Sequence, residues 1–262
     1  YIAIADHEST HSLPAACALG EDLNLHVIPA VEIAARHNET GINVHLLCYY
    51  PADTKRLQKR LDKDLKLFSD SVIRSYQSLM DEYPITMDQL YEASRQSTGI
   101  YYTHIMQVLS LMGYTGQPIG ELHRELFHPG SPHKFQTDYM DAMEAVRLIR
   151  SCGGVPVLAH PGQYKNPMLM EMMIEDHMMD GFELNHPRND EKTMEQIKVL
   201  CKEHDLFMTG GTDFHGLYTT TPYPLGSFLC PEEGLERLID AGKKANEAYY
   251  QKKAAKKDPE AD

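Results

Sequence analysis

The sequence contains no tryptophan, few cysteines and fewer basic than acidic residues. Its five cysteines lie far apart and form no C-x-x-C pair. This excludes a disulfide framework and a zinc–thiolate site and is typical of a reducing cytoplasm. Lys and Arg number 25 against 38 Asp and Glu, which gives a formal net charge of −13. Proteins that hold long nucleic acids by neutralising phosphates usually carry the opposite sign, so we expect no long nucleic-acid partner.

Long apolar runs and patterns typical of a signal peptide do not occur in the sequence either. No stretch approaches the roughly 18 apolar residues that a membrane helix needs, and no charged start followed by an apolar run resembles a signal peptide. We therefore expect a cytoplasmic protein without a membrane partner. Hydrophobic residues make up 42% of the 262, which is enough for one large core, or for one core and a smaller domain.

Secondary-structure patterns divide the chain into three parts. Short apolar runs alternate with helical patterns in residues 1–50, and this alternation returns in residues 133–262. Between them, residues 51–132 have an almost wholly helical pattern. Alternating strands and helices predict a parallel sheet covered by helices. We expect residues 1–50 and 133–262 to form one α/β domain, and residues 51–132 to form a helical insertion, or lid domain, over one end of it.

Periodicity and capping residues predict the individual elements. The expected strands are residues 1–5, 27–33, 44–49, 155–159, 181–184 and 206–209, and residues 38–41 (NETG) are expected to form a turn between the second and third of them. The expected helices include residues 13–22, 57–76, 87–95, 104–112, 139–150 and 191–204, and a C-terminal helix from about residue 243 that frays after residue 256. Thr86 is the expected N-cap of the helix over residues 87–95.

Histidines and carboxylates gather at the predicted strand ends. The chain has 14 histidines, an unusual number for its length. The ligand-type residues in or after predicted strands are His7, Glu32, His45, His160, Asp213 and His215. Because the carboxyl ends of parallel strands face the same way, side chains distant in sequence converge in one crevice. Imidazole and carboxylate ligands without thiolate suit zinc, manganese or iron, and two or more ions where a carboxylate bridges them.

Each of these residues also has a structural interpretation. A single strand-end histidine is more often a hydrogen-bonded structural residue than a ligand, and Glu32 could be a solvated strand terminus. Asp213 and His215 could belong to a turn after a glycine pair. The combination favours a metal site, because four strand ends each present a ligand-type residue beside glycine or proline, where the backbone bends tightly or lies close to something.

Five segments together resemble a known family. They are Ile4–Thr10 (IADHEST), Pro29–Glu32 (PAVE), His45–Leu47 (HLL), Leu158–Gly162 (LAHPG) and Gly211–Gly216 (GTDFHG). Their order and spacing are similar to the PHP (polymerase and histidinol phosphatase) family over nearly the whole chain. The inserted helices resemble the branch of small stand-alone PHP phosphoesterases, some of which act on nucleoside 3′,5′-bisphosphates or trim short oligonucleotides. The resemblance implies an α/β fold, a distorted (β/α)7 barrel with metal ions at the strand carboxyl ends.

The resemblance also implies a set of metal ligands. They are His7, Glu32, His45, His160, Asp213 and His215, with Glu32 bridging two ions, and His104 from the insertion would complete a third site. The implied cofactors are two to three divalent ions of manganese, zinc or iron. Tyr102 stands where the family usually has an arginine near this last histidine, so a histidine on a helix surface stays the alternative for His104.

The first motif of the family does not occur in this sequence. The family begins with His-x-His on its first strand, followed by an acidic residue, whereas this sequence starts at Tyr1 inside an apolar run. We expect the first barrel strand to lie upstream, within roughly 25–30 further residues that form one strand and one helix. A natural start at Tyr1 would instead favour a non-catalytic binding module.

The expected reaction is hydrolysis of phosphomonoesters, and the expected partner is a small phosphorylated substrate. Nucleotides are the favoured class, as nucleoside bisphosphates or short oligonucleotide ends. Metal ions lower the pKa of bound water, and the resulting hydroxide attacks phosphorus. The expected catalytic residues are Glu32, as the bridging ligand, and His186, which could donate a hydrogen bond or protonate the leaving group.

Three residues are expected to contact the substrate. Arg188 follows the strand over residues 181–184, and its planar guanidinium matches phosphate oxygens. Gln163 occupies a place where the family often has arginine, and Tyr102 borders the expected cleft, where it could stack on a base. The structural alternatives are a loop charge for Arg188, a loop histidine for His186 and a half-buried packing residue for Tyr102.

Two other functions stay open. Metal-dependent amidohydrolases also use strand-end His and Asp residues of a barrel, but they cleave C–N bonds and usually follow a different motif order. A PHP-like module that binds without catalysis is the second alternative. A comparison of turnover on phosphomonoesters with turnover on amides, both with manganese added, distinguishes a phosphatase from the first alternative.

Overall fold

The computed structural model describes residues 1–174 and 179–256. The chain forms two compact units. The first, called the sheet unit, comprises Tyr1–Leu61, Tyr139–Asp213 and the chain from Leu225 onward. The second, called the helical unit, comprises Asp62–Asp138 and Phe214–Pro224. The lid role expected for the inserted helices stays a prediction.

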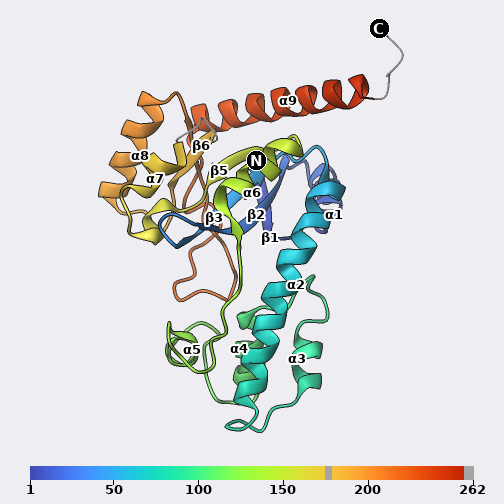
Figure 1. Ribbon diagram of the computed structural model, residues 1–262, viewed down its shortest axis with the longest axis vertical. Coiled ribbons are helices and arrows are strands. Elements are labelled where there is room, and N and C mark those ends of the chain that lie inside the picture. The colour runs from blue at the N-terminus through green and yellow to red at the C-terminus, as the bar shows by residue number, and fades with distance from the viewer. Residues whose placement is uncertain (175–178, 257–262) are drawn as a thin grey trace. The chain divides into compact units, whose positions relative to one another are not determined.

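The sheet unit is built on a seven-stranded sheet (Figure 1). Its strands are β1 (Ile2–His7), β2 (Val27–His37), β3 (Ile42–Tyr49), β4 (Met140–Asp141), β5 (Val155–Leu158), β6 (Gly181–Asn185) and β7 (Phe207–Gly210). The order across the sheet is β1-β2-β3-β5-β6-β7, and β4 pairs with β2. β3 runs antiparallel to β2 and β5, and the other pairs are parallel. The parallel sheet predicted from the sequence is therefore wrong at β3.

A short turn makes β3 antiparallel. β2 continues beyond its expected end at residue 33 as far as His37, and residues 38–41 then reverse the chain into β3. Gly41 supplies a positive φ of 68° in this turn, a conformation that glycine adopts without strain. A connection this short joins only antiparallel strands, because a parallel pair needs a crossover of about a dozen residues. The strand that carries His45 therefore runs in the opposite direction to the strand that carries Glu32.

Helices pack against the sheet, and two hydrophobic cores result. The helices of this unit are α1 (Leu13–Asp22), α6 (Ala142–Ser151), α7 (Leu169–Ile174), α8 (Glu191–Glu203) and α9 (Glu232–Ala255), with a 3₁₀ turn, η1 (Pro161–Tyr164). Side chains alternate along a strand. Ile33 and Leu46 therefore enter one core with α6, α7 and α8, whereas Leu47 and Tyr49 enter a second core with Leu238 of α9.

The start of α6 differs from the prediction for a local reason. The helix begins at Ala142 rather than at residue 139, because the Asp141 carboxylate accepts the backbone N–H groups of Met143 and Glu144. A carboxylate in this position satisfies amides that have no partner within the helix. The two residues before Ala142 form β4 instead.

The last helix is longer than predicted. α9, red in Figure 1, begins at Glu232 rather than near residue 243, and it contacts β5 and β7. Leu238 is buried there and gives the early part of the helix its apolar face. Residues 257–262, where fraying was expected, lie outside the described residues. None of the helices in the described ranges is both long and apolar enough to cross a membrane.

The helical unit has its own core. Its helices are the greater part of α2 (Thr54–Leu79), together with α3 (Met87–Ala93), α4 (Tyr102–Leu111) and α5 (Glu121–Phe127). Tyr76, Ile105 and Leu109 are fully buried among them. The predicted N-cap Thr86 is confirmed, since it forms a capping box with Gln89 at the start of α3.

Candidate metal centre

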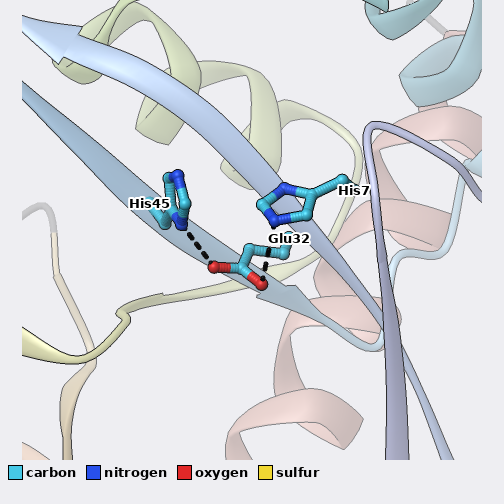
Figure 2. Close-up of side chains that lie close together, drawn as sticks. All are labelled: His7, Glu32 and His45. Carbon is cyan, nitrogen blue, oxygen red and sulfur yellow. Dashed lines mark ion pairs between the residues drawn. The ribbon is translucent and has the colours of Figure 1, made fainter. Parts of the chain in front are cut away.

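Three adjacent strands bring His7, Glu32 and His45 together (Figure 2). His7 and Glu32 lie opposite each other in the parallel β1–β2 pair. His45 lies opposite Ala34 in the β2–β3 hairpin, which places it diagonally from Glu32 on the same face of the sheet. One potential ligand atom from each of the three residues lies within 4.8 Å of the others. The register of the strands thus builds the cluster.

This route to the cluster differs from the one expected from the sequence. His7 ends β1, but Glu32 lies in the middle of β2 and His45 in the first half of β3. The expectation that Glu32 ends its strand is therefore wrong. His45 lies within its strand, as expected, but that strand runs antiparallel to β2. Cross-strand neighbours in a mixed sheet, rather than a ring of strand ends, bring the side chains together.

Glu32 lies at the centre of the cluster and is only 6% exposed. Its Oε1 lies 2.7 Å from Nδ1 of His45 and 3.1 Å from Nε2 of His160, and its Oε2 lies 3.7 Å from Nε2 of His7. Burial by itself would raise the pKa of Glu32, but the neighbouring imidazoles outweigh it and hold the pKa well below its ordinary value. Burial lowers the pKa of His7, yet Glu32 and other carboxylates outweigh it, so this pKa is raised.

His160 joins the cluster from the loop after β5. It is buried, and its Nε2 lies 3.3 Å from Nδ1 of His45. Its backbone is left-handed, with φ 31° and ψ 61°, which costs a residue other than glycine about 1–3 kcal/mol. Among the residues that the structure describes, Nδ1 of His160 finds no hydrogen-bond partner. A strained backbone and an unpaired buried nitrogen are both typical of functional sites.

Two further buried carboxylates border the cluster, and the sequence patterns did not assign them. Glu183 of β6 accepts the backbone N–H of His160 at 2.9 Å, and Glu8 accepts that of Ala34 at 2.6 Å. Burial raises the pKa of both groups, and Glu32 adds to it in each case. The signals that mark them in the sequence are a carboxylate inside an otherwise apolar strand and a carboxylate directly after His7.

The loop after β6 carries His186 and Arg188. The Arg188 backbone N–H donates to Nδ1 of His186 at 3.0 Å, so the neutral ring carries its proton on Nε2. That Nε2 lies 3.5 Å from Oδ2 of Asp213, and the His186 ring centre lies 5.0 Å from that of His160. The Arg188 side chain is exposed, and Gln163 lies in η1 beside His160. The roles expected for these side chains stay predictions.

Tyr102, His104 and His215 belong to the helical unit. Nδ1 of His104 accepts the backbone N–H of Tyr101 at the start of α4, and burial lowers the pKa of His104. The Tyr102 hydroxyl lies 3.2 Å from that of Ser75 on α2, and His215 is exposed. Their assignment as ligands or as substrate contacts stays a prediction.

Gly162 lies where two loops of the site meet. A Cβ at this position would lie 2.4 Å from the Arg188 carbonyl oxygen and 2.9 Å from Cα of Asn189. We therefore expect Gly162→Ala to lower the free energy of unfolding by about 1–3 kcal/mol, measured by urea titration of the metal-free protein. Gly116→Ala is the matched control, because a Cβ there meets nothing within 4 Å. Equal losses for the two variants would contradict the prediction.

The cluster is chemically suited to divalent metal ions. Its potential ligand atoms are imidazole nitrogens and carboxylate oxygens, a mixture that suits zinc, manganese and iron. A cation at the cluster would meet Nε2 of buried His160, which lies 3.1 Å from Oε1 of Glu32. It would also offset the repulsion among the carboxylates of Glu32, Glu183 and Asp213, which adds to the effect of burial in raising the pKa of Glu183.

Known proteins resemble the chain in sequence and in fold, although no family model matches it. The phosphoribosyl 1,2-cyclic phosphate 1,2-diphosphodiesterase of Eggerthella lenta is 30% identical over 227 residues, or 85% of each chain. The 3′,5′-nucleoside bisphosphate phosphatase of Chromobacterium violaceum is 29% identical over 96 residues, which are 35% of this chain and 34% of that protein. The crystal structure of a Bifidobacterium adolescentis protein, assigned as a metal-dependent phosphoesterase, has a TM-score of 0.81 at 24% identity and covers 92% of this chain and 85% of its own.

The fold and the relatives together define the class of protein. A curled, half-barrel α/β sheet that carries a partly buried cluster of histidine and glutamate is the architecture of a metal-dependent phosphoesterase, a hydrolase. The chain belongs to the PHP family. The PHP-type distorted barrel and the phosphoesterase activity predicted from the sequence are confirmed.

Proposed function

We propose that this phosphoesterase acts on small phosphate esters of ribose, including nucleotides. The Eggerthella lenta relative is named for a phosphoribosyl cyclic phosphate and the Chromobacterium violaceum relative for a nucleoside bisphosphate. Both names describe phosphate attached to a pentose. The single observation that carries the proposal is the buried Glu32 carboxylate, which three imidazoles approach.

We further propose that two or three divalent ions, of manganese, zinc or iron, bind at this cluster. The two oxygens of Glu32 face different partners, Oε2 toward His7 and Oε1 toward His45 and His160. This division suits a carboxylate that bridges two ions. Bound ions supply Lewis acidity toward phosphoryl oxygens and lower the pKa of water.

The chain's own residues then hold and orient the reacting groups. Glu183 fixes the backbone of His160 by accepting its N–H. Nε2 of His186 lies 3.5 Å from Oδ2 of Asp213, and among the described residues it has no hydrogen-bond partner. Because the His186 side chain is only 1% exposed, its geometry supports orientation of Asp213 more directly than contact with a leaving group. The exposed Arg188 is the candidate for binding substrate phosphate, because its guanidinium donates paired hydrogen bonds to phosphate oxygens.

Arg188→Ala is expected to weaken transition-state binding by about 1–3 kcal/mol, the range for a hydrogen bond to a charged group. The loss should appear as a raised KM or a lowered kcat/KM, with metal content unchanged. Arg147→Ala on α6 is the control, since this arginine is also exposed and in the sheet unit. If kcat/KM for Arg188→Ala equals that of Arg147→Ala, the side chain is only a loop charge.

The substrate proposal is tested by turnover of a defined panel after metal analysis. The panel contains phosphoribosyl 1,2-cyclic phosphate, a nucleoside 3′,5′-bisphosphate, a short RNA oligonucleotide, p-nitrophenyl phosphate and an amide, each with manganese, zinc or iron. We expect metal-dependent turnover of a ribose phosphate at a higher kcat/KM than that of p-nitrophenyl phosphate. Preferential cleavage of the amide, or equal rates on all phosphate esters, would refute the proposed substrate class.

A further inference from the structure

The backbone hydrogen bonding between β3 and β5 is interrupted next to the metal centre. Leu46 and Leu158 form a regular antiparallel pair, so His45 and Ala159 are the next residues in register. The Ala159 N–H donates to the His45 carbonyl at 3.1 Å. In a closed pair of this type the two residues exchange both bonds, and the His45 N–H would donate back to the Ala159 carbonyl.

A side-chain hydroxyl takes the place of that second bond. The Tyr164 hydroxyl accepts the His45 N–H at 2.7 Å and donates to the Ala159 carbonyl at 3.0 Å. One oxygen atom therefore bridges the two strands where their direct hydrogen bond would form. Both backbone groups keep a partner, but the strands are held further apart at this step than a direct bond would hold them.

The bridge lies between two residues of the cluster. His45 belongs to one strand of the opened step, and His160 follows Ala159 on the other. The ring of Tyr164 also lies against that of His160, with centres 5.6 Å apart. On its other side, His160 is fixed by the bond from its N–H to Glu183. Nδ1 of His45 and Nε2 of His160 lie 3.3 Å apart. This distance therefore depends on how far apart the two backbones lie at the His45–Ala159 pair.

We propose that Tyr164 is a positioning residue, whose hydroxyl is inserted between β3 and β5 and sets the spacing of His45 and His160 before metal binds. This inference rests on the proposed metal site and deepens it. Without the hydroxyl, either the strands close onto a direct bond or two backbone groups lose their partners. Both changes move the His45 ring relative to the His160 ring, although Tyr164 itself is not a ligand.

Tyr164→Phe tests the proposal because it removes a single oxygen atom. Tyr76→Phe is the matched control, since the Tyr76 hydroxyl also donates to a backbone carbonyl, that of Thr86 at 2.8 Å, but in the helical unit. We expect Tyr164→Phe to bind Co²⁺ about 10- to 100-fold more weakly than wild type, as for other residues that orient ligands. Its Co²⁺ absorption spectrum should also change, whereas Tyr76→Phe keeps the wild-type affinity and spectrum.

A second measurement uses the metal-free protein. Hydrogen exchange followed by mass spectrometry should show faster exchange in the segments around His45 and Ala159 for Tyr164→Phe, and wild-type exchange there for Tyr76→Phe. Wild-type Co²⁺ affinity and spectrum in Tyr164→Phe would overturn the proposal. So would equal weakening in both variants, since the effect would then be general destabilisation. Failure of the wild-type protein to bind Co²⁺ would instead contradict the proposed metal site itself.

Discussion

Glu32→Gln is expected to abolish phosphoesterase turnover and to remove at least one metal ion per chain. The amide keeps the size of the side chain but loses the negative charge on which His7, His45 and His160 converge. Residues that only orient metal ligands contribute about 10- to 100-fold to affinity or activity. Loss of a bridging ligand should therefore lower kcat/KM by more than about 100-fold, measured alongside metal content by plasma mass spectrometry.

The hairpin that carries Glu32 also provides its control. Glu39 is exposed in the turn between β2 and β3, so Glu39→Gln makes the same chemical change without touching the cluster. It should keep full metal content and turnover. A Glu32→Gln protein with unchanged stoichiometry would show that this carboxylate does not bridge ions, even if turnover fell.

Replacement of His160 should separate ligand chemistry from backbone strain. His160→Ala and His160→Asn both remove the imidazole that faces Glu32 at 3.1 Å, so both should lose more than about 100-fold in metal-dependent kcat/KM. They should differ in stability. Asparagine tolerates the left-handed region better than alanine, and this residue has φ 31°. We expect the free energy of unfolding of metal-free His160→Asn to exceed that of His160→Ala by about 1 kcal/mol.

The comparison is made in EDTA, so that metal binding does not contribute to stability. Urea unfolding gives the stability of each metal-free variant, and turnover with added manganese gives the catalytic loss. Asn24→Ala measures the cost of a left-handed backbone alone, because Asn24 also has a positive φ, 52°, but is not part of the cluster. Near-wild-type turnover of His160→Asn would exclude the imidazole from the metal centre.

Elements with strong periodicity were predictable from the sequence. The helix α1 has the predicted bounds, and the Thr86 cap of α3 follows from the polar residue before an apolar periodic run. The direction of β3 was not predicted, because an apolar strand has the same pattern whether it runs parallel or antiparallel. The turn predicted at residues 38–41 is confirmed, and it carried the information on direction, since its length permits only a hairpin.

The composition of the site was easier to predict than its geometry. Residue type and position singled out His7, Glu32, His45 and His160, which the structure brings together. Glu183 was not singled out, because a carboxylate in an apolar strand gives no sign of which face it occupies until the register is known. Tyr164 gave even less signal, since its role depends on a hydroxyl that enters between two strands distant in the sequence.

The β2–β3 hairpin has a consequence for the order in which the molecule assembles. Glu32 and His45 lie on strands joined by a tight turn, so their contact has low sequence separation and needs little loop closure. His160 is 128 residues from Glu32 in the sequence, so their contact must close a much longer loop. The ligand atoms of Glu32 and His45 can therefore come together in an early local structure, whereas binding by all the ligands requires the native long-range contacts. The rate of metal uptake during refolding should thus follow the slowest closure of the chain rather than formation of the hairpin.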